Sequence, residues 1–295
     1  MNEESFTKKL AALFPQGPDV KVGPGDDCAV LDLGMKELFL AAVDQVISKV
    51  HYLEGCPPSY VAGKLLKRNI SDIAAMGGLP THALLSIAVN PMDEEWLALF
   101  HEAMAKFSKV YGISVIGGDM ARLFTPGEVL SLTILGKVER EKLCLRSGAK
   151  KNDLLYATGS FGNSFYSGHH LEFTPRLEEA RFLAGNFTHA MQDVSDGLLK
   201  DAARMAEASG LALALEPEKV PLRRGASVEA ALTNGEDYEL LIAVPPSLTF
   251  RLERAWSFPT ALTRIGKFIE GTPGQVAGTE ELNLSQKPTG YDHFQ

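Results

Sequence analysis

The 295-residue chain lacks the short motifs of several common enzyme classes. It contains no GxxxxGK phosphate loop followed by Ser or Thr, no GxSxG nucleophile elbow, no HExxH zinc pair and no protein-kinase signature. Its three cysteines, Cys28, Cys56 and Cys144, are odd in number and never spaced as CxxC. This argues against a disulfide framework and against zinc held by cysteine pairs. We therefore expect reduced thiols, and no P-loop or zinc-protease chemistry.

Positive charge and long apolar runs are also scarce. Lys and Arg number 29 against 37 Asp and Glu, a formal net charge of -8, so a broad basic face for nucleic acid is not expected. The first ten residues, MNEESFTKKL, lack the basic start and apolar stretch of a signal peptide. Apolar runs such as Leu38–Val43 are too short to cross a bilayer. We expect a cytoplasmic protein that partners neither nucleic acid nor membrane.

What the sequence does contain fits a globular protein of about two domains. Hydrophobic residues make up 45% and charged residues 22% of the chain. Apolar runs of strand length end before small or acidic residues at Leu38–Val43, Ile113–Ile116 and Leu154–Ala157, and Val129–Val138 is a further strand candidate. We expect residues 1–145 and 146–295 to form two domains of an α/β or α+β fold.

Three segments have the periodicity of amphipathic helices. The first is Ser59–Met76, with Ser59 as its possible cap and Gly77-Gly78 as its stop. The second runs from about Met92 to Tyr111 and carries a stripe of large apolar residues expected in the core, and the third runs from about Asp196 to Ala208.

Acidic residues stand repeatedly beside glycine or at expected strand ends, as in Gly25-Asp26-Asp27, Gly117-Gly118-Asp119, QDVSDG (192–197) and NGEDY (234–238). Glycine allows phosphate or metal to approach the backbone, and Mg²⁺ prefers carboxylate, water and phosphate oxygens. Asp72 lies on a helical face from which it could reach such a cluster. Any one of these motifs alone is more often a solvated turn, and Ser195 could simply cap a helix. Together they predict a metal-phosphate site.

The order of these motifs resembles the thiamine-monophosphate kinase family. The series is GDDCAVL (25–31), VD (43–44) with His51-Tyr52 downstream, NISDIAAMGGLP (69–80), IGGD (116–119), RSGAK (146–150), TGSFGNS (158–164), QDVSDGL (192–198), GEDYEL (235–240) and GYDHF (290–294). The family belongs to the aminoimidazole-ribotide-synthetase-like superfamily of ATP users, which lack a P-loop. The match covers nearly the whole chain.

This resemblance implies a two-domain fold, with an N-terminal mixed, barrel-forming sheet that binds ATP and metal and dimerises, and a C-terminal α/β domain. It implies Mg²⁺ and ATP as cofactor and co-substrate, thiamine monophosphate as acceptor, and a homodimer. Positions matching the family's metal ligands are Asp27, Asp44, Asp72, Asp119, Asp193 and Asp196. Those matching ATP contacts are Gly117, Gly118, Arg146 and Ser195. Those matching substrate contacts are His51, Glu236 and, more weakly, Tyr291.

The residues are consistent with that chemistry. A phosphate acceptor is largely ionised at neutral pH, so it needs no general base, and catalysis becomes positioning and charge stabilisation of an in-line transfer. In an acidic protein metal ions must neutralise the two anions, with Arg146 as the expected cationic clamp.

Several positions depart from the family pattern. Val43 replaces a hydroxyl-bearing residue, so that only its backbone carbonyl could serve as a ligand. Asn163 stands for Asp, Glu172 stands for Arg, the connection from Ser164 to His169 is shortened, and Asn234 replaces a glycine. Two alternatives stay open at this point: a sister ATP-dependent enzyme acting on another small metabolite, and a non-catalytic nucleotide-binding paralogue.

Overall fold

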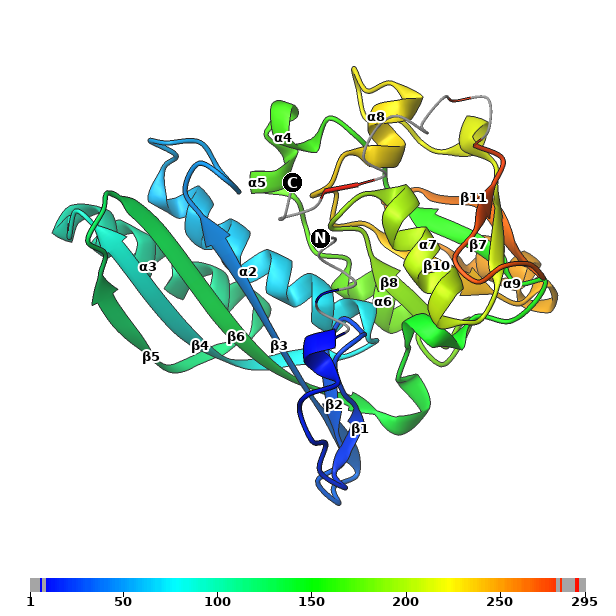
Figure 1. The fold of residues 1–295 in the computed structure, drawn as a ribbon, viewed down its shortest axis with the longest axis horizontal. Coiled ribbons are helices and arrows are strands. Elements are labelled where there is room, and N and C mark those ends of the chain that lie inside the picture. Colours follow the sequence, from blue (N-terminus) through cyan, green and yellow to red (C-terminus); the bar gives the residue numbers. More distant parts are fainter. Residues whose placement is uncertain (1–5, 7–8, 280–281, 283–289, 292–295) are drawn as a thin grey trace.

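The computed structural model describes residues 6, 9–279, 282, 290 and 291. Within them the chain forms two six-stranded sheets, one from each half of the sequence, as Figure 1 shows. Of the expected C-terminal motif, residues 292–294 lie outside the described residues.

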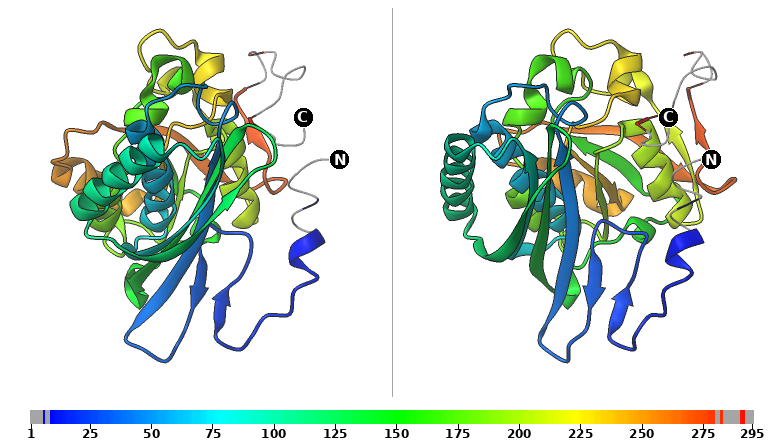
Figure 2. Two further views of the ribbon diagram at one scale, coloured as in Figure 1. Left: turned by 90° about the vertical axis from the view of Figure 1, so that its left-hand side faces the viewer. Right: turned by 60° about the vertical axis from the view of Figure 1, so that its left-hand side comes forward.

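The N-terminal sheet has the strand order β1-β2-β3-β6-β4-β5. Its pairs are antiparallel except β4 with β5, which run parallel. Helices α2 and α3 pack together against this sheet (Figures 1 and 2). Its elements are β1 (Val20–Val22), β2 (Ala29–Leu31), β3 (Glu37–Ile47), α2 (Pro58–Ala75), β4 (Leu79–Asn90), α3 (Glu94–Tyr111), β5 (Ser114–Arg122) and β6 (Gly127–Glu139).

The C-terminal sheet has the order β12-β9-β11-β7-β10-β8. Two short 3-10 helices, η1 (Arg140–Lys142) and η2 (Arg146–Gly148), connect the halves. The remaining elements are β7 (Leu154–Thr158), α4 (Ser164–Ser167), α5 (His169–Glu172), α6 (Leu177–Leu183), β8 (Ala190–Asp193), α7 (Leu198–Ala208), β9 (Ala212–Leu215), η3 (Pro217–Lys219), α8 (Val228–Thr233), β10 (Leu240–Val244), α9 (Pro246–Ala255), β11 (Leu262–Ile269) and β12 (Val276–Ala277).

Helix α2 lies between the two halves and belongs to both of their cores (Figure 1). Its apolar residues Leu65 and Ile70 are in the N-terminal core, whereas Ala74 and Ala75 are in a core with residues of the C-terminal sheet. Because apolar side chains contact a partner on both sides, even polar residues of this helix are buried, Lys64 and Asn69 completely. Helix α2 can therefore present polar groups to a site between the halves.

Two strands are longer than the sequence predicts. The expectation that a strand ends before Asp44 is wrong, because β3 continues through Asp44, which pairs with Leu132 of β6. The expectation that a strand ends at Ile116 is also wrong, because β5 includes the whole of Gly117-Gly118-Asp119. Asp44 and Gly117-Gly118-Asp119 pair with the neighbouring strand, although the register of β4 with β5 shifts beside Ile116, between Ala83 and Leu84.

The three predicted helices are present, but two of their expected starts are wrong. Helix α2 begins at Pro58, which suits a first helical position, and Ser59 does not cap it. Helix α7 begins at Leu198, and Ser195 does not cap it either. Instead Asp201 Oδ2 accepts the backbone N–H groups of Ser195, Asp196 and Gly197 at 3.1, 3.0 and 3.2 Å. Asp201 thus fixes the turn that leads into α7, whose N-cap residue Gly197 has no side chain to cap with.

Helix α3 agrees more closely with its pattern. Asp93 Oδ1 caps it by accepting from the backbone of Glu95 and Trp96, and Gly112 ends it in the left-handed conformation with φ 67°. The stripe of large apolar residues lies in or against the N-terminal core, as predicted: Trp96, Phe100, Met104, Phe107 and Tyr111.

Candidate active site

Three of the predicted aspartates converge between the two halves. Asp27 lies in the loop between β1 and β2, Asp72 lies on α2, and Asp193 ends β8. One carboxylate oxygen of each lies within 4.8 Å of the other two. Ser71 Oγ donates to Asp193 Oδ2 at 2.6 Å, which fixes the position of that carboxylate. Among the described residues, these three form the group of acidic, histidine and cysteine side chains that could share one metal ion.

The electrostatics of this cluster favour a cation. Burial, followed by the charges of Asp44, Asp193 and Asp27, raises the pKa of Asp72 well above its usual value. Burial and then Asp27 likewise raise the pKa of Asp193. Asp27 Oδ2 is buried with no hydrogen-bond partner among the described residues. Asp72 and Asp193 have no ion-pair partner among the described residues, and buried carboxylates without counter-charge are costly. A divalent cation with oxygen preference satisfies them. The residues therefore fit Mg²⁺.

Arg146 closes one side of the cluster. Its Nη2 donates to Asp27 Oδ1, and its backbone N–H donates to Asp26 Oδ2 at 3.1 Å. Its Nε is buried with no hydrogen-bond partner among the described residues, and lies 4.0 Å from Asp26 Oδ1. Arg146 begins η2, so this contact joins the first residues of the C-terminal half to the loop that carries Asp27. The guanidinium is next to the candidate metal ligands and retains an unused donor there.

A cavity of about 470 Å³ is lined by none of the three carboxylates, but residues just after Asp193 in the chain line it. Its lining includes all three predicted substrate residues, His51, Glu236 and Tyr291, together with Ser195 and Asp196. They come from separate segments of both halves. Arg68 and Tyr238 line the same cavity. Its size and its mixture of aromatic and charged groups suit a small heterocyclic ligand.

A buried lysine links two of the cavity residues. Lys64 of α2 is completely buried, and its Nζ donates to the backbone oxygen of His51 and to Glu236 Oε2, both at 2.5 Å. Burial lowers the pKa of Lys64 to about 8, although Glu236 acts in the opposite direction. His51 is held at a second point, because its Nδ1 accepts the backbone N–H of Ile47 at 3.0 Å.

Asp44 and Asp196 lie outside the three-carboxylate group. Arg68 Nε donates to Asp44 Oδ2 at 2.6 Å, and Asn69 Oδ1 accepts the Asp44 backbone N–H at 3.1 Å. Asp196 pairs with Lys200 at 3.0 Å and Arg204 at 2.8 Å. Burial alone would raise its pKa, but these two cations hold the pKa of Asp196 below its usual value. Both aspartates thus already have a cationic partner.

Asp119, Gly117 and Gly118 are on β5, the edge strand farthest from β1. All nine residues of β5 are exposed. A Cβ at Gly118 would lie 1.8 Å from the Leu85 backbone oxygen, so close packing against β4 requires glycine there. Within the described residues, this single chain does not bring the predicted metal ligand Asp119 to the other carboxylates.

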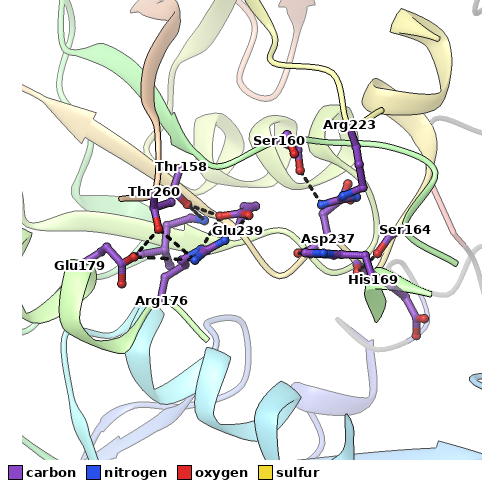
Figure 3. Close-up of polar contacts among 12 residues, drawn as sticks. Thr158, Ser160, Ser164, His169, Arg176, Glu179, Arg223, Asp237, Glu239 and Thr260 are labelled. Carbon is purple, nitrogen blue, oxygen red and sulfur yellow. Dashed lines mark hydrogen bonds and ion pairs between the residues drawn. The ribbon is translucent and has the colours of Figure 1, made fainter. Parts of the chain in front are cut away.

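A network of ion pairs fixes the loop between the cavity and the C-terminal sheet, as Figure 3 shows. Arg176 Nε and Nη2 donate to both oxygens of Glu239 at 2.7 and 2.6 Å, and Thr158 Oγ1 donates to Glu239 Oε2 at 2.7 Å. Arg223 pairs with Asp237, which also accepts the Gly162 backbone N–H. Asp237 and Glu239 of GEDYEL (235–240) are therefore structural, whereas Glu236 and Tyr238 line the cavity.

The sequence analysis missed Lys64, Arg68 and Tyr238. Lys64 and Arg68 are four apart on α2 and so share a face, but a lysine or arginine on a helix is normally exposed, which gave no signal. Tyr238 adopts φ +51°, and its hydroxyl is buried with no partner among the described residues. Its position inside the GEDYEL motif was the available signal.

No helix in the described part of the chain is long and apolar enough to cross a membrane.

Comparisons with known proteins show the family to which the chain belongs. The family models for the N-terminal and C-terminal domains of AIR synthase related protein match residues 25–138 and 146–277. Thiamine-monophosphate kinase of Rhodopirellula baltica is 34% identical over 92% of this chain and 90% of its own. That of Escherichia coli (strain K12) is 32% identical over 94% and 93%.

Solved structures of similar fold include a thiamine-monophosphate kinase relative with bound ligands. AaThiL complexed with AMPPCP and TMP matches with a TM-score of 0.84 at 26% identity, covering 99% of this chain and 97% of that chain. Hydrogenase maturation protein HypE, at 15% identity and a TM-score of 0.66 over 88% of this chain and 90% of that chain, shows the fold alone. The chain belongs to the AIR synthase related proteins and, within them, to the thiamine-monophosphate kinase family.

Proposed function

We propose that this protein is a thiamine-monophosphate kinase, which transfers the γ-phosphoryl group of ATP to the phosphate of thiamine monophosphate and forms thiamine diphosphate. The observation that carries the proposal is likeness over more than nine-tenths of the chain to curated kinases of that name. The carboxylate cluster beside a cavity of ligand size supports it.

Mg²⁺ is the proposed cofactor, held by Asp27, Asp72 and Asp193. Bound Mg²⁺ would supply positive charge to the phosphate oxygens of both substrates. Arg146 would add a fixed guanidinium beside it, since its Nε has no hydrogen-bond partner among the described residues. ATP is the proposed co-substrate and would bind beside Arg146 and the three carboxylates.

The chain's own residues then act mainly by positioning. The acceptor phosphate is already ionised at neutral pH, so no side chain has to remove a proton from it. His51, Glu236 and Tyr291 would orient the thiamine part in the cavity, and the Tyr291 ring offers an aromatic face to its thiazolium cation. Holding the acceptor in line with ATP is the main source of the rate.

A homodimer is part of the proposal. Strand β5 has an unpaired edge. Large apolar residues are exposed on β3, β4 and β5, with these exposed fractions: Val43 65%, Ile116 56%, Met120 47%, Val115 41% and Leu84 40%. An apolar, glycine-containing edge of this kind invites pairing with a second copy. In such a dimer Asp119, Gly117 and Gly118 would lie in the interface, from which they could complete the partner's ATP site. A cytoplasmic location, with its reducing conditions, suits the three free thiols.

The test is an assay of purified protein with ATP, Mg²⁺ and thiamine monophosphate, in which ADP and thiamine diphosphate are separated by chromatography. We expect equal amounts of both products, and neither above background when EDTA is added or thiamine monophosphate is left out. ADP without thiamine diphosphate would contradict the proposed function.

A further inference from the structure

The contacts of Lys64 determine which atom of Glu236 faces the cavity. Lys64 Nζ donates to Glu236 Oε2, so this oxygen is committed within the protein. Glu236 Oε1 makes no hydrogen bond with the described residues, and the Glu236 side chain is 20% exposed while that of Lys64 is not exposed. The oxygen left to a ligand is therefore Oε1.

The same ammonium removes most of the charge that Glu236 would otherwise present. A lysine–glutamate pair at 2.5 Å with one fully buried partner is close to neutral as seen from the cavity. Lys64 also binds the backbone oxygen of His51, so its charge and position are fixed from both halves of the molecule. Glu236 then acts as a hydrogen-bond acceptor and contributes little net negative charge.

We propose that Lys64 is a positioning residue that determines substrate specificity, because it orients Glu236 so that an acceptor oxygen, Oε1, receives an N–H group of the ligand. This rests on the proposed function. Thiamine monophosphate carries one conventional N–H donor, the amino group of its pyrimidine ring, and that group is the predicted partner of Oε1. The pocket thus distinguishes an amino-pyrimidine from its oxo analogue by hydrogen-bond polarity.

A consequence follows for the Glu236→Gln variant. While Lys64 is an ammonium it can only donate, so its Nζ then donates to the amide oxygen of the new side chain. The amide nitrogen is then forced into the place of Oε1, and an acceptor becomes a donor. When Lys64 is replaced by Met as well, the amide can rotate freely and no polarity is imposed.

The experiment measures affinities of thiamine monophosphate and oxythiamine monophosphate by calorimetry, with AMPPCP as a second ligand. For the unmodified protein we expect thiamine monophosphate to bind at least about tenfold more tightly than the oxo analogue. In Glu236→Gln the preference should disappear or reverse, and in Lys64→Met/Glu236→Gln it should be intermediate. AMPPCP affinity should stay within about twofold throughout, because a role in folding alone would weaken all ligands together.

Lys67 provides the matched control. It is on the same helix, it is also buried, and its Nζ donates to the backbone oxygen of Leu171 at 2.8 Å outside the cavity lining. Lys67→Met should therefore keep the tenfold preference even where the melting temperature falls.

The outcomes separate the two proposals. A protein that binds thiamine monophosphate with the same preference in Glu236→Gln would overturn the role of Lys64 and leave the kinase assignment intact. A protein that does not bind thiamine monophosphate at all would overturn the kinase assignment, and the role of Lys64 with it.

Discussion

Replacing Asp72 with Asn should stabilise the metal-free protein while it abolishes turnover. Asp72 is one of three clustered carboxylates, and burial with the charges of Asp44, Asp193 and Asp27 raises its pKa. An amide of nearly the same shape removes one buried charge and its repulsion. By analogy with other buried ionic groups replaced by neutral ones, we expect a gain of about 1–3 kcal/mol in the free energy of unfolding. For a chain of this size that corresponds to a rise of roughly 2–5 °C in melting temperature.

The sign of the pH dependence provides a second readout. A carboxyl whose pKa is higher in the folded state binds more protons there than in the unfolded state, so its contribution to stability is lost as pH rises from its unfolded pKa through its folded pKa. With EDTA present, Asp72 and Asp193 should therefore make the free energy of unfolding larger at pH 5 than at pH 8. In Asp72→Asn this fall in stability should be smaller.

Calorimetric melting with EDTA and with excess Mg²⁺ and AMPPCP measures both effects. Metal and nucleotide should raise the melting temperature of the unmodified protein far more than that of Asp72→Asn. With these ligands the two melting temperatures should become equal or change order. Turnover of the variant should fall by about a hundredfold or more. A variant that melts lower than the unmodified protein in EDTA, or that keeps its turnover, would refute the reasoning.

Three further changes test other parts of the structure. Tyr238→Phe removes a buried hydroxyl that has no partner among the described residues, so the melting temperature should stay equal or rise by the equivalent of about 1 kcal/mol; a clear fall would show that the hydroxyl is paired. Asp201→Ala takes the acceptor from three backbone N–H groups at the start of α7 and a partner from Arg204, and denaturant unfolding should show a loss of at least about 2 kcal/mol. Ile116→Lys places a charge on the exposed β5 edge and should convert a dimer to a monomer in light scattering, whereas an unchanged mass would contradict the proposed interface.

Much of the acidic cluster could be predicted because its members stand in motifs that differ from ordinary sequence. Asp27 and Asp193 stand in the glycine-containing motifs GDD and QDVSDG, and the family resemblance added Asp72 as a ligand; the structure brings the three together. The lengths of β3 and β5 could not be predicted in the same way. Asp44 and Asp119 lie within strands although aspartate is uncommon there. Pairing with the neighbouring strand, and not the preference of the residue itself, keeps the backbone extended at both positions.

Two buried cations of α2 were not predictable from local patterns: Arg68, which lines the cavity, and Lys64, which bonds to the lining residue Glu236. Lys64 and Arg68 look like surface residues of an amphipathic helix, and only the packing of both halves on α2 buries them. The Asp201 contact was missed for a similar reason, because an acid inside the first turn of a helix is usually attributed to the helix dipole alone. Resemblance, and not spacing, associated His51, Glu236 and Tyr291 with one substrate.

The most direct measurement of the proposed site is a crystal structure with Mn²⁺, AMPPCP and thiamine monophosphate, with anomalous scattering recorded at the manganese edge. We expect an anomalous peak in contact with Asp27, Asp72 and Asp193, and thiamine monophosphate in the cavity lined by His51 and Glu236. Manganese bound away from these three carboxylates, or thiamine monophosphate bound outside this cavity, would contradict the proposed arrangement.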